Sequence, residues 1–260
     1  MPLLATDAIV LHAFDYMETS RILRLVTREA GVQSALAKGA RRAQRKYGSA
    51  LDLFAEGAAQ LYTKEGRDLH TLSSFDVTRA RPELAEDLGR FTGAAAIAEL
   101  TLRFSPRDES HPSLYDAVVA VLDALGAAEP GRAREVGVAG TWRLIAELGF
   151  TPALDACSVC HADVPRDEPA MFSHPAGGVL CARCARTVPG SRVVPAAARD
   201  SLRAWLGALP HPLGDDAQAR AHQRLLREFV AEHLNDGRPL RAFELWETDR
   251  WGTTPRLAAP

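Results

Sequence analysis

The residues best suited to chemistry are four cysteines, which are the only cysteines of the 260-residue chain. They form two C-x2-C pairs, Cys157–Cys160 and Cys181–Cys184, with 20 residues between the pairs. Each C-x2-C turn lets two sulfurs converge on one ion, and two turns complete the tetrahedron typical of protein zinc sites. Four thiolates leave no open position for water. We therefore expect one Zn²⁺ ion with a structural role, bound by Cys157, Cys160, Cys181 and Cys184.

Other uses of the four thiols remain open at this point. They could hold an iron–sulfur cluster, form a redox dithiol, or be unrelated to one another. Two matched pairs favour zinc over a redox site. His161 and His174 lie near the pairs in sequence and could replace a thiolate, but four cysteines already satisfy one ion, so we expect both to be bystanders. Gly177 and Gly178 allow a tight turn into the second pair.

A cluster of cations is the second candidate site. Residues 30–51 carry five positive charges and no negative charge, in the stretch KGARRAQRKYG. Arginine and lysine contact phosphates, and an aromatic ring can stack on an exposed base. The alternative is a solvated charged loop. The glycines around the cluster and the adjacent tyrosine favour nucleic-acid binding, and the residues expected to make it are Lys38, Arg41, Arg42, Arg45, Lys46 and Tyr47.

Three common catalytic motifs are absent from the sequence. It has no phosphate loop of the G-x-x-x-x-G-K-[ST] type, no G-x-S-x-G elbow and no H-E-x-x-H. The acidic pair Asp215-Asp216 is better explained as a helix N-terminal cap than as a metal site. We therefore expect a protein that is not an enzyme and has no small-molecule substrate.

The net charge of −2 argues against a uniformly basic nucleic-acid binder, but the charge is unevenly distributed. Residues 1–80 carry a net charge of +2, residues 81–155 carry −5 and residues 156–260 carry +1. The acidic middle therefore offsets a mildly basic N-terminal region. This distribution predicts that nucleic acid binds the N-terminal region, with the arginine-bearing C-terminal region as an open alternative, and that the middle is free for protein partners.

The N-terminal region reads as β-structure. Short runs rich in strand formers alternate with turns, such as Arg28–Gly31 and Lys64–Arg67. Five short strands in about 80 residues indicate a small closed barrel, and a five-stranded OB-like barrel fits that count. Phe54 and Tyr62 could stack on bases, but we expect them in the core. The expected strands are 8–14, 20–27, 32–37, 51–63 and 69–77.

The rest of the chain reads mainly as helices. Apolar residues recur at helical spacing, Pro82 suits a first helical turn, and Gly149 suits a C-terminal cap. We interpret the apolar stripes as core packing. The tail after Trp251 is expected to be a short irregular end. The expected helices begin at Pro82 and run through Leu102, then cover 113–125, 132–148, 195–209 and 216–234.

Composition and targeting signals indicate a cytoplasmic protein. Hydrophobic residues make up 47% of the chain and charged residues 25%, as in ordinary soluble proteins. No apolar run reaches the roughly 18 residues of a membrane span. Residues 1–10 lack the basic start of a secretory signal. We expect no membrane association.

Three stretches resemble the bacterial RecO recombination-mediator family of DNA repair proteins. The first runs from Tyr16 to Gly31 (YMETSR through LVTREAG). The second is AKGARR at 37–42, followed by Tyr47-Gly48 and Leu51. The third starts with LGFTP at 148–152 and includes both cysteine pairs, Phe172-Ser173 and Gly177-Gly178. The combination of AKGARR with two cysteine pairs is more specific than either motif alone, and the resemblance spans nearly the whole chain.

The resemblance implies an α+β protein with an N-terminal five-stranded OB-fold barrel, then an α-helical domain with an inserted four-cysteine zinc ribbon. It implies binding of single- and double-stranded DNA and annealing of complementary strands. It also implies partnership with RecR and with single-stranded-DNA-binding protein, so that RecA loads onto coated DNA during recombinational repair. No cofactor beyond zinc is implied, and action in the bacterial cytoplasm, at the nucleoid when on DNA, is expected.

The expected domains are 1–80, an OB-fold DNA-binding domain, and 81–260, a helical domain with a zinc module at 155–187. The main alternative is an interaction adaptor in which the zinc ribbon and the acidic helical surface bind protein. In that alternative, contact with DNA is incidental.

Overall fold

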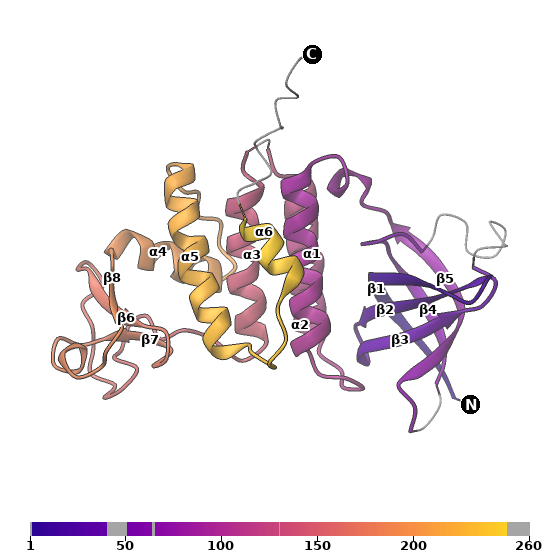
Figure 1. The fold of residues 1–260 in the computed structure, drawn as a ribbon, viewed down its shortest axis with the longest axis horizontal. Helices are drawn as coiled ribbons and strands as arrows, with labels where there is room; N and C mark the ends of the chain where they lie inside the picture. Colours follow the sequence, from indigo (N-terminus) through magenta and orange to yellow (C-terminus); the bar gives the residue numbers. More distant parts are fainter. Residues whose placement is uncertain (1, 41–50, 64–65, 130, 249–260) are drawn as a thin grey trace, which may run out of the picture. The chain divides into compact units, whose positions relative to one another are not determined.

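A computed structural model describes residues 2–40, 51–63, 66–129 and 131–248. Over these ranges the chain forms two compact units, shown in Figure 1. Unit 1 comprises residues 1–128 and 240–260, and unit 2 comprises residues 129–239. The α+β class expected from the sequence is confirmed, with a β-barrel in unit 1 and helices in both units.

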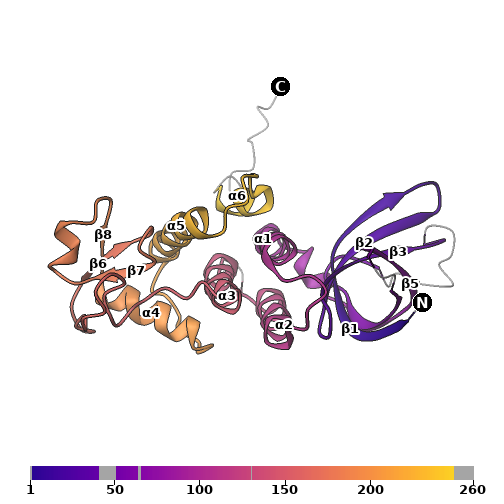
Figure 2. The same cartoon turned by 90° about the horizontal axis from the view of Figure 1, so that it is seen from below.

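The barrel in unit 1 is closed and has five strands in the order β1-β2-β3-β5-β4, seen as a ring in Figure 2. β1 bends through a register shift between Val10 and His12, so that its first half pairs with β4 and its second half with β2. The ring closes through a parallel pairing of β3 with β5. The strands are β1 (Leu3–Tyr16), β2 (Ser20–Thr27), β3 (Gly31–Ala37), β4 (Glu56–Tyr62) and β5 (Leu69–Arg79).

The barrel interior follows from the two-residue period of its strands. On β2, Leu23 and Leu25 point inward, and on β3, Ala35 and Ala37 do the same. Five strands of this kind close around a small apolar core, which is the OB-type barrel that the sequence predicted. Residues 51–55, expected as part of the fourth strand, instead form an irregular segment whose Leu51 is buried in that core.

The helices of unit 1 come from two separate stretches of chain. They are η1 (Pro82–Leu84), α1 (Leu88–Phe104), α2 (Pro112–Gly126) and α6 (Arg241–Glu247). The single helix expected from Pro82 to Leu102 is therefore wrong at its start. A short 3-10 turn precedes α1, because the Asp87 side chain accepts a hydrogen bond from the Arg90 amide and caps a new helix there.

Helix α6 was not expected from the sequence, and its contacts explain why. It is only seven residues long and has no side-chain cap of its own. Instead, the carboxylate of Glu99 on α1 accepts hydrogen bonds from the amides of Arg241, Ala242 and Phe243 at 2.9–3.0 Å. A cap that comes from more than 140 residues away leaves no local signal.

Unit 2 combines three helices with a small three-stranded sheet of order β7-β6-β8. Asp215 caps α5 by accepting from the Gln218 amide, which confirms the capping role expected for the acidic pair. Gly149, with φ +92°, follows the end of α3 as expected. The elements are α3 (Ala133–Glu147), β6 (Ala170–Ser173), β7 (Gly178–Leu180), η2 (Cys184–Arg186), β8 (Arg192–Val194), α4 (Ala196–Leu206) and α5 (Asp216–His233).

Candidate metal centre and nucleic-acid surface

The four cysteines converge on one point in unit 2. Their sulfur atoms all lie within 4.8 Å of one another, and the Sγ atoms of Cys160 and Cys181 are 3.7 Å apart. None of the four forms a disulfide. A tetrahedral Zn²⁺ ion with bonds of about 2.3 Å would separate its sulfur ligands by about 3.8 Å. The four thiols are therefore not unrelated to one another, and their spacing fits a metal ion.

The backbone around each pair explains the convergence. In the first pair, the His161 amide donates to the Cys157 carbonyl at 2.9 Å, which closes the C-x2-C turn. In the second pair, the Ala185 amide donates to the Cys181 carbonyl, also at 2.9 Å. β7 ends at Leu180, directly before Cys181, so the sheet fixes the position at which the second C-x2-C turn begins.

Gly178 permits a close backbone contact that brings the two turns together. A Cβ atom at this position would lie 2.4 Å from the Ala153 carbonyl oxygen, which no side chain tolerates. The Val179 amide donates to that same carbonyl at 2.9 Å, and the Ala153 amide donates to the Gly177 carbonyl. Gly177 itself has φ +73°, a left-handed conformation that favours glycine. Gly177 therefore has the turn-forming role that the sequence predicted, whereas Gly178 begins β7 and is required for the close contact with Ala153.

The thiols have different affinities for protons. Burial of Cys157 favours its neutral form, but the amides of Cys181, Cys160 and Val159 outweigh burial and lower its pKa to about 6. Hydrogen bonding to the Cys160 thiol, followed by burial, raises the pKa of Cys184 to about 12. A thiolate is the metal-binding form, so Cys157 is charged and ready to bind a cation at neutral pH.

Neither nearby histidine belongs to the cysteine cluster. Within the described residues, the only group of at least three metal-binding side chains that converges is the four cysteines. His174 is buried, and its Nε2 lies 2.9 Å from Glu228 Oε2. Burial lowers the pKa of His174 and outweighs the opposing effect of Glu228. The histidines are thus bystanders, as expected.

Arg199 on α4 holds the cysteine-bearing segment in place, and the sequence analysis missed it. Its side chain is fully buried and donates to the carbonyls of Leu154, Pro165 and Glu168 at 2.6–2.9 Å. Burial lowers the pKa of the guanidinium. The available signal was spacing, because Arg199 precedes the buried Leu202 by three residues and lies on the apolar face of α4.

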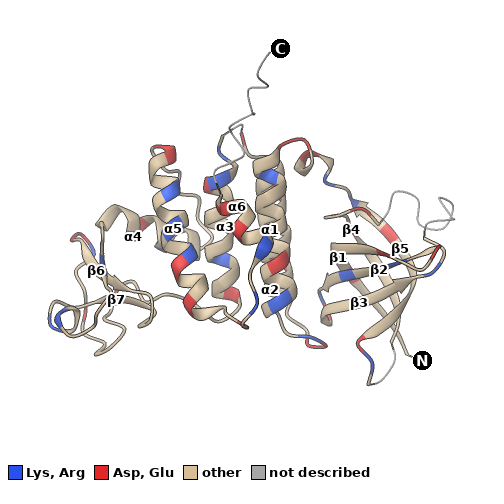
Figure 3. Cartoon of the chain, in the orientation of Figure 1, with Lys and Arg blue, Asp and Glu red and all other residues tan. Residues whose placement is uncertain are grey.

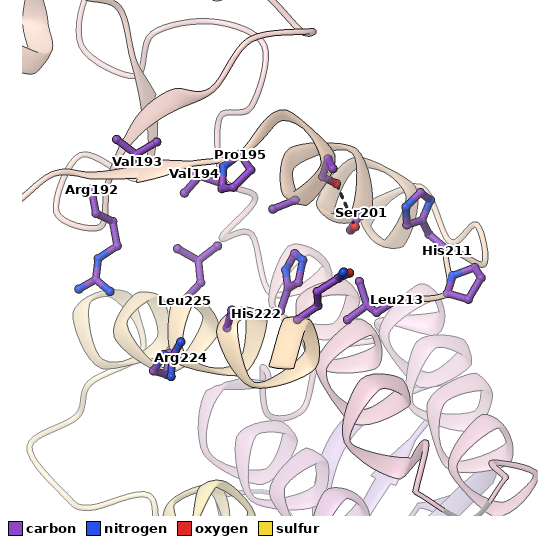
Figure 4. Close-up of a pocket in the computed structure, with 15 residues that line it drawn as sticks. Arg192, Val193, Val194, Pro195, Ser201, His211, Leu213, His222, Arg224 and Leu225 are labelled. Carbon is purple, nitrogen blue, oxygen red and sulfur yellow. Dashed lines mark hydrogen bonds between the residues drawn. The ribbon is translucent and has the colours of Figure 1, made fainter. Parts of the chain in front are cut away.

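A cavity of about 480 Å³ lies between β8, α4 and α5 (Figure 4). Its walls are mostly apolar and include Val194, Pro195, Leu213 and Leu225. His222 lines it, is almost fully buried, and has no hydrogen-bond partner at Nδ1 among the residues that the structure describes. Burial lowers the pKa of His222 to about 4, and nearby His211 adds to the shift. The ring is therefore neutral at physiological pH.

The basic segment belongs to the barrel, although most of it lies outside the described residues. Lys38 directly follows β3 and is exposed. The other predicted DNA contacts, Arg41, Arg42, Arg45, Lys46 and Tyr47, fall in the stretch 41–50 that the structure does not describe. Ala40 packs on the barrel core and Leu51 is buried within it. Both flanks of the segment are thus anchored to the barrel between β3 and β4.

The two aromatic residues expected in the core have different environments. Phe54 is buried, as expected. Tyr62 is 41% exposed, so its expected core position is wrong. Residues alternate along β4, and because Leu61 points into the barrel, Tyr62 must point out of it.

Charges on the helices are mixed. Helix α5 carries Arg220, Arg224 and Arg227, but also Asp216 and two glutamates, so both colours alternate along it in Figure 3. Helix α1 likewise carries both signs. Neither helix presents the field of one sign that concentrates DNA. Among the described residues, no helix is long and apolar enough to cross a membrane.

Comparison with known proteins assigns both parts of the chain. Residues 1–81 match the family model described as Recombination protein O N terminal, and residues 85–242 match Recombination protein O C terminal. The chain is 38% identical over 246 residues to a "DNA repair protein RecO" from Anaeromyxobacter sp. (strain K), covering 90% of this chain and 92% of the relative. It is 32% identical over 238 residues to the protein of the same name from Myxococcus xanthus (strain DK1622), covering 92% and 94%.

Proposed function

The chain belongs to the RecO family of DNA repair proteins, and from that premise we propose that it is a DNA-binding recombination mediator. The observation that carries the proposal is the closed OB-type barrel with a basic segment anchored between β3 and β4. Barrels of this type commonly hold nucleic acid on the outer strand face and adjacent loops. The mediator binds single- and double-stranded DNA and anneals complementary strands.

The proposed DNA contacts are Lys38, Arg41, Arg42, Arg45, Lys46 and Tyr47. Five cations without an intervening acid can neutralise several phosphates at once. These contacts hold the sugar–phosphate backbone without reading the sequence. Annealing follows, because two strands can approach when their mutual repulsion is screened.

The proposed partners are RecR and single-stranded-DNA-binding protein, with which the chain helps to load RecA onto coated single strands. Four cysteines hold one structural Zn²⁺ ion, and the spacing of their sulfurs supports this. The ion closes the site with protein ligands and supplies no catalytic step. The protein is proposed to act in the cytoplasm and not to be an enzyme.

The domain division is part of the same proposal. The DNA-binding domain covers 1–80, and the helical domain covers 81–260 with the zinc module at 155–187. The junction between the two matched family models, at residues 81–85, supports this division. The compact units divide the chain differently, because α1, α2 and α6 belong with the barrel to unit 1.

DNA binding measured against salt tests the proposal. Affinity for a labelled single-stranded oligonucleotide should fall steeply with salt. For each phosphate neutralised, the logarithm of the binding constant should fall by about 0.7 per tenfold increase in salt concentration. The variant R41E/R42E should bind more weakly and show a shallower slope. The control R186E/R224E makes the same change in net charge at exposed arginines of unit 2. Equal losses of DNA affinity in R41E/R42E and R186E/R224E would rule out the basic segment as the principal contact.

Annealing is the second test. Two complementary oligonucleotides coated with single-stranded-DNA-binding protein should anneal faster when the protein and RecR are present. Absence of a mobility shift with single-stranded DNA at moderate salt would instead favour the protein-interaction adaptor.

A further inference from the structure

A groove on unit 1 combines exposed apolar side chains with carboxylates, and we call it the acidic groove. It has a volume of about 1120 Å³ and is lined by residues of β1, β2, β5, the segment before β4 and the segment that leads into α1. Most small-molecule sites occupy roughly 300–1,000 Å³. The acidic groove is larger, so it has room for a segment of polypeptide.

Three separate stretches of chain each place an apolar side chain next to an aspartate at the acidic groove. The three apolar side chains are 39–43% exposed, which is unusual for residues of this size and polarity beside a folded core. Exposed apolar side chains that gather in one place mark a surface that a partner covers. The neighbouring pairs are Phe14-Asp15, Asp52-Leu53 and Asp76-Val77.

The pair Asp52-Leu53 is exposed because the backbone turns sharply at Phe54. The φ of Phe54 is +65°, a left-handed conformation that is costly for a phenylalanine. Two hydrogen bonds hold it, since the Phe54 amide donates to the Val10 carbonyl at 2.7 Å and the Phe54 carbonyl accepts from Arg81 at 2.9 Å. A strained conformation fixed by several contacts is typical of binding surfaces that are formed in advance.

The pair Asp76-Val77 is exposed because β5 is irregular at this point. Gly57 on β4 pairs with Val77, whereas the adjacent Glu56 pairs with Arg79, so β5 contains one extra residue there. Such a bulge bends the strand and re-aims its side chains. Both Asp76 and Val77 are exposed as a result, although neighbouring strand residues normally alternate between core and solvent.

The carboxylates make the acidic groove negative. Its two arginines do not offset them, because Arg81 is fully buried between other carboxylates and Arg21 pairs with Asp15 at 3.2 Å. Asp52 and Asp76 have no ion-pair partner among the residues that the structure describes. Unpaired carboxylates beside apolar side chains attract cations and repel phosphates and acidic peptides.

We infer that the acidic groove docks a basic amphipathic segment of a protein partner. Lysine or arginine side chains of that segment pair with Asp52 and Asp76, and its apolar side chains cover Phe14, Leu53 and Val77. Segments that carry both kinds of side chain commonly bind grooves in this way. The inference goes beyond the proposed function and does not rest on it, because the acidic groove repels DNA and selects a protein.

The test titrates the full chain with a fluorescein-labelled amphipathic peptide built of leucine and lysine, and with its counterpart built of leucine and glutamate. Fluorescence anisotropy measures both affinities. The variant D52N/D76N removes the charges and keeps the side-chain shapes, and L53S/V77T removes apolar surface. The control D167N/E232Q makes the same change in net charge at exposed acids of unit 2. Thermal unfolding of all variants should match the wild type, because every replaced side chain is exposed.

The wild type should bind the lysine peptide at least about tenfold more tightly than the glutamate peptide. D52N/D76N should bind the lysine peptide about fivefold more weakly and with less dependence on salt, while D167N/E232Q should stay within about twofold. L53S/V77T should lose affinity with unchanged salt dependence.

Three results would overturn the inference: equal affinity of D52N/D76N and D167N/E232Q for the lysine peptide, equal affinity of the wild type for both peptides, or wild-type affinity in L53S/V77T. DNA binding by the wild type is measured separately. Failure of peptide binding would therefore leave the proposed function standing, and failure of DNA binding would leave the acidic groove as a protein-docking site.

Discussion

The fully buried guanidinium of Arg81 donates to the Glu56 carboxylate at 2.6 Å. The same group donates to Asp123 Oδ1 at 2.7 Å and to the Phe54 carbonyl at 2.9 Å. One side chain thus connects the start of β4 with α2 and with the segment that precedes β4. A buried charge is tolerated only when partners compensate it, so this connection needs both carboxylates.

Replacing Arg81 should therefore destabilise the barrel and its helices. Arg81→Ala leaves Glu56 and Asp123 without their buried cation, and we expect a loss of about 3–5 kcal/mol in the free energy of unfolding. Urea unfolding followed by circular dichroism measures it. Arg79→Ala is the matched control, because Arg79 also pairs with Asp123 but is half-exposed, and it should cost less than about 1 kcal/mol. Similar losses in both variants would contradict the role of the buried contact.

Glu99 should determine whether α6 forms. In Glu99→Ala, the amides of Arg241, Ala242 and Phe243 lose their acceptor, and we expect α6 to become less stable by about 1 kcal/mol. Hydrogen exchange measures the protection of these amides. Amides of β2 and β3 in the same protein provide an internal reference that should not change. Unchanged exchange in 241–243 would show that the carboxylate is not the cap.

Metal content tests the cysteine centre. Purified protein should contain one zinc per chain by mass spectrometry, and Cys157→Ser should lose it together with solubility and thermal stability. His161→Ala is the control and should retain the zinc, because His161 lies outside the convergent group. In Cys157→Ser, the thermal stability should fall clearly, whereas the DNA affinity of the folded fraction should change less. A coloured iron species, or protein without metal, would contradict the assignment.

The buried His222 should make stability depend on pH. An unfolded histidine takes up a proton near pH 6.5, but the folded ring stays neutral until about pH 4. The contribution of the neutral His222 ring to the free energy of unfolding is therefore fully present above pH 6.5. It is lost as pH falls towards 4, by about 3 kcal/mol in total. His222→Phe should flatten this part of the stability curve. His211→Ala should leave it nearly intact, and an unchanged slope in His222→Phe would refute the prediction.

Much of the fold could be predicted because its signals are local. The alternation of β2 and β3 and the caps at Asp215 and Gly149 depend on neighbours a few residues away. The exposed position of Tyr62 is also a local property, because it follows from the alternation of Tyr62 with the inward-facing Leu61. Arg199 was missed because arginine side chains are mostly exposed in proteins, even where the helical spacing places one beside apolar residues.

The sequence by itself determined the set of four sulfur ligands, the barrel and helices, and the family resemblance, because residue type, spacing and period are properties of the chain. Tertiary structure alone decided which distant groups meet. It brought Cys160 within 3.7 Å of Cys181, placed Glu99 at the start of α6 and aligned Phe14 with Ile22 and Leu36. Such contacts depend on chain topology and strand register, which many sequence segments specify jointly and no single segment encodes.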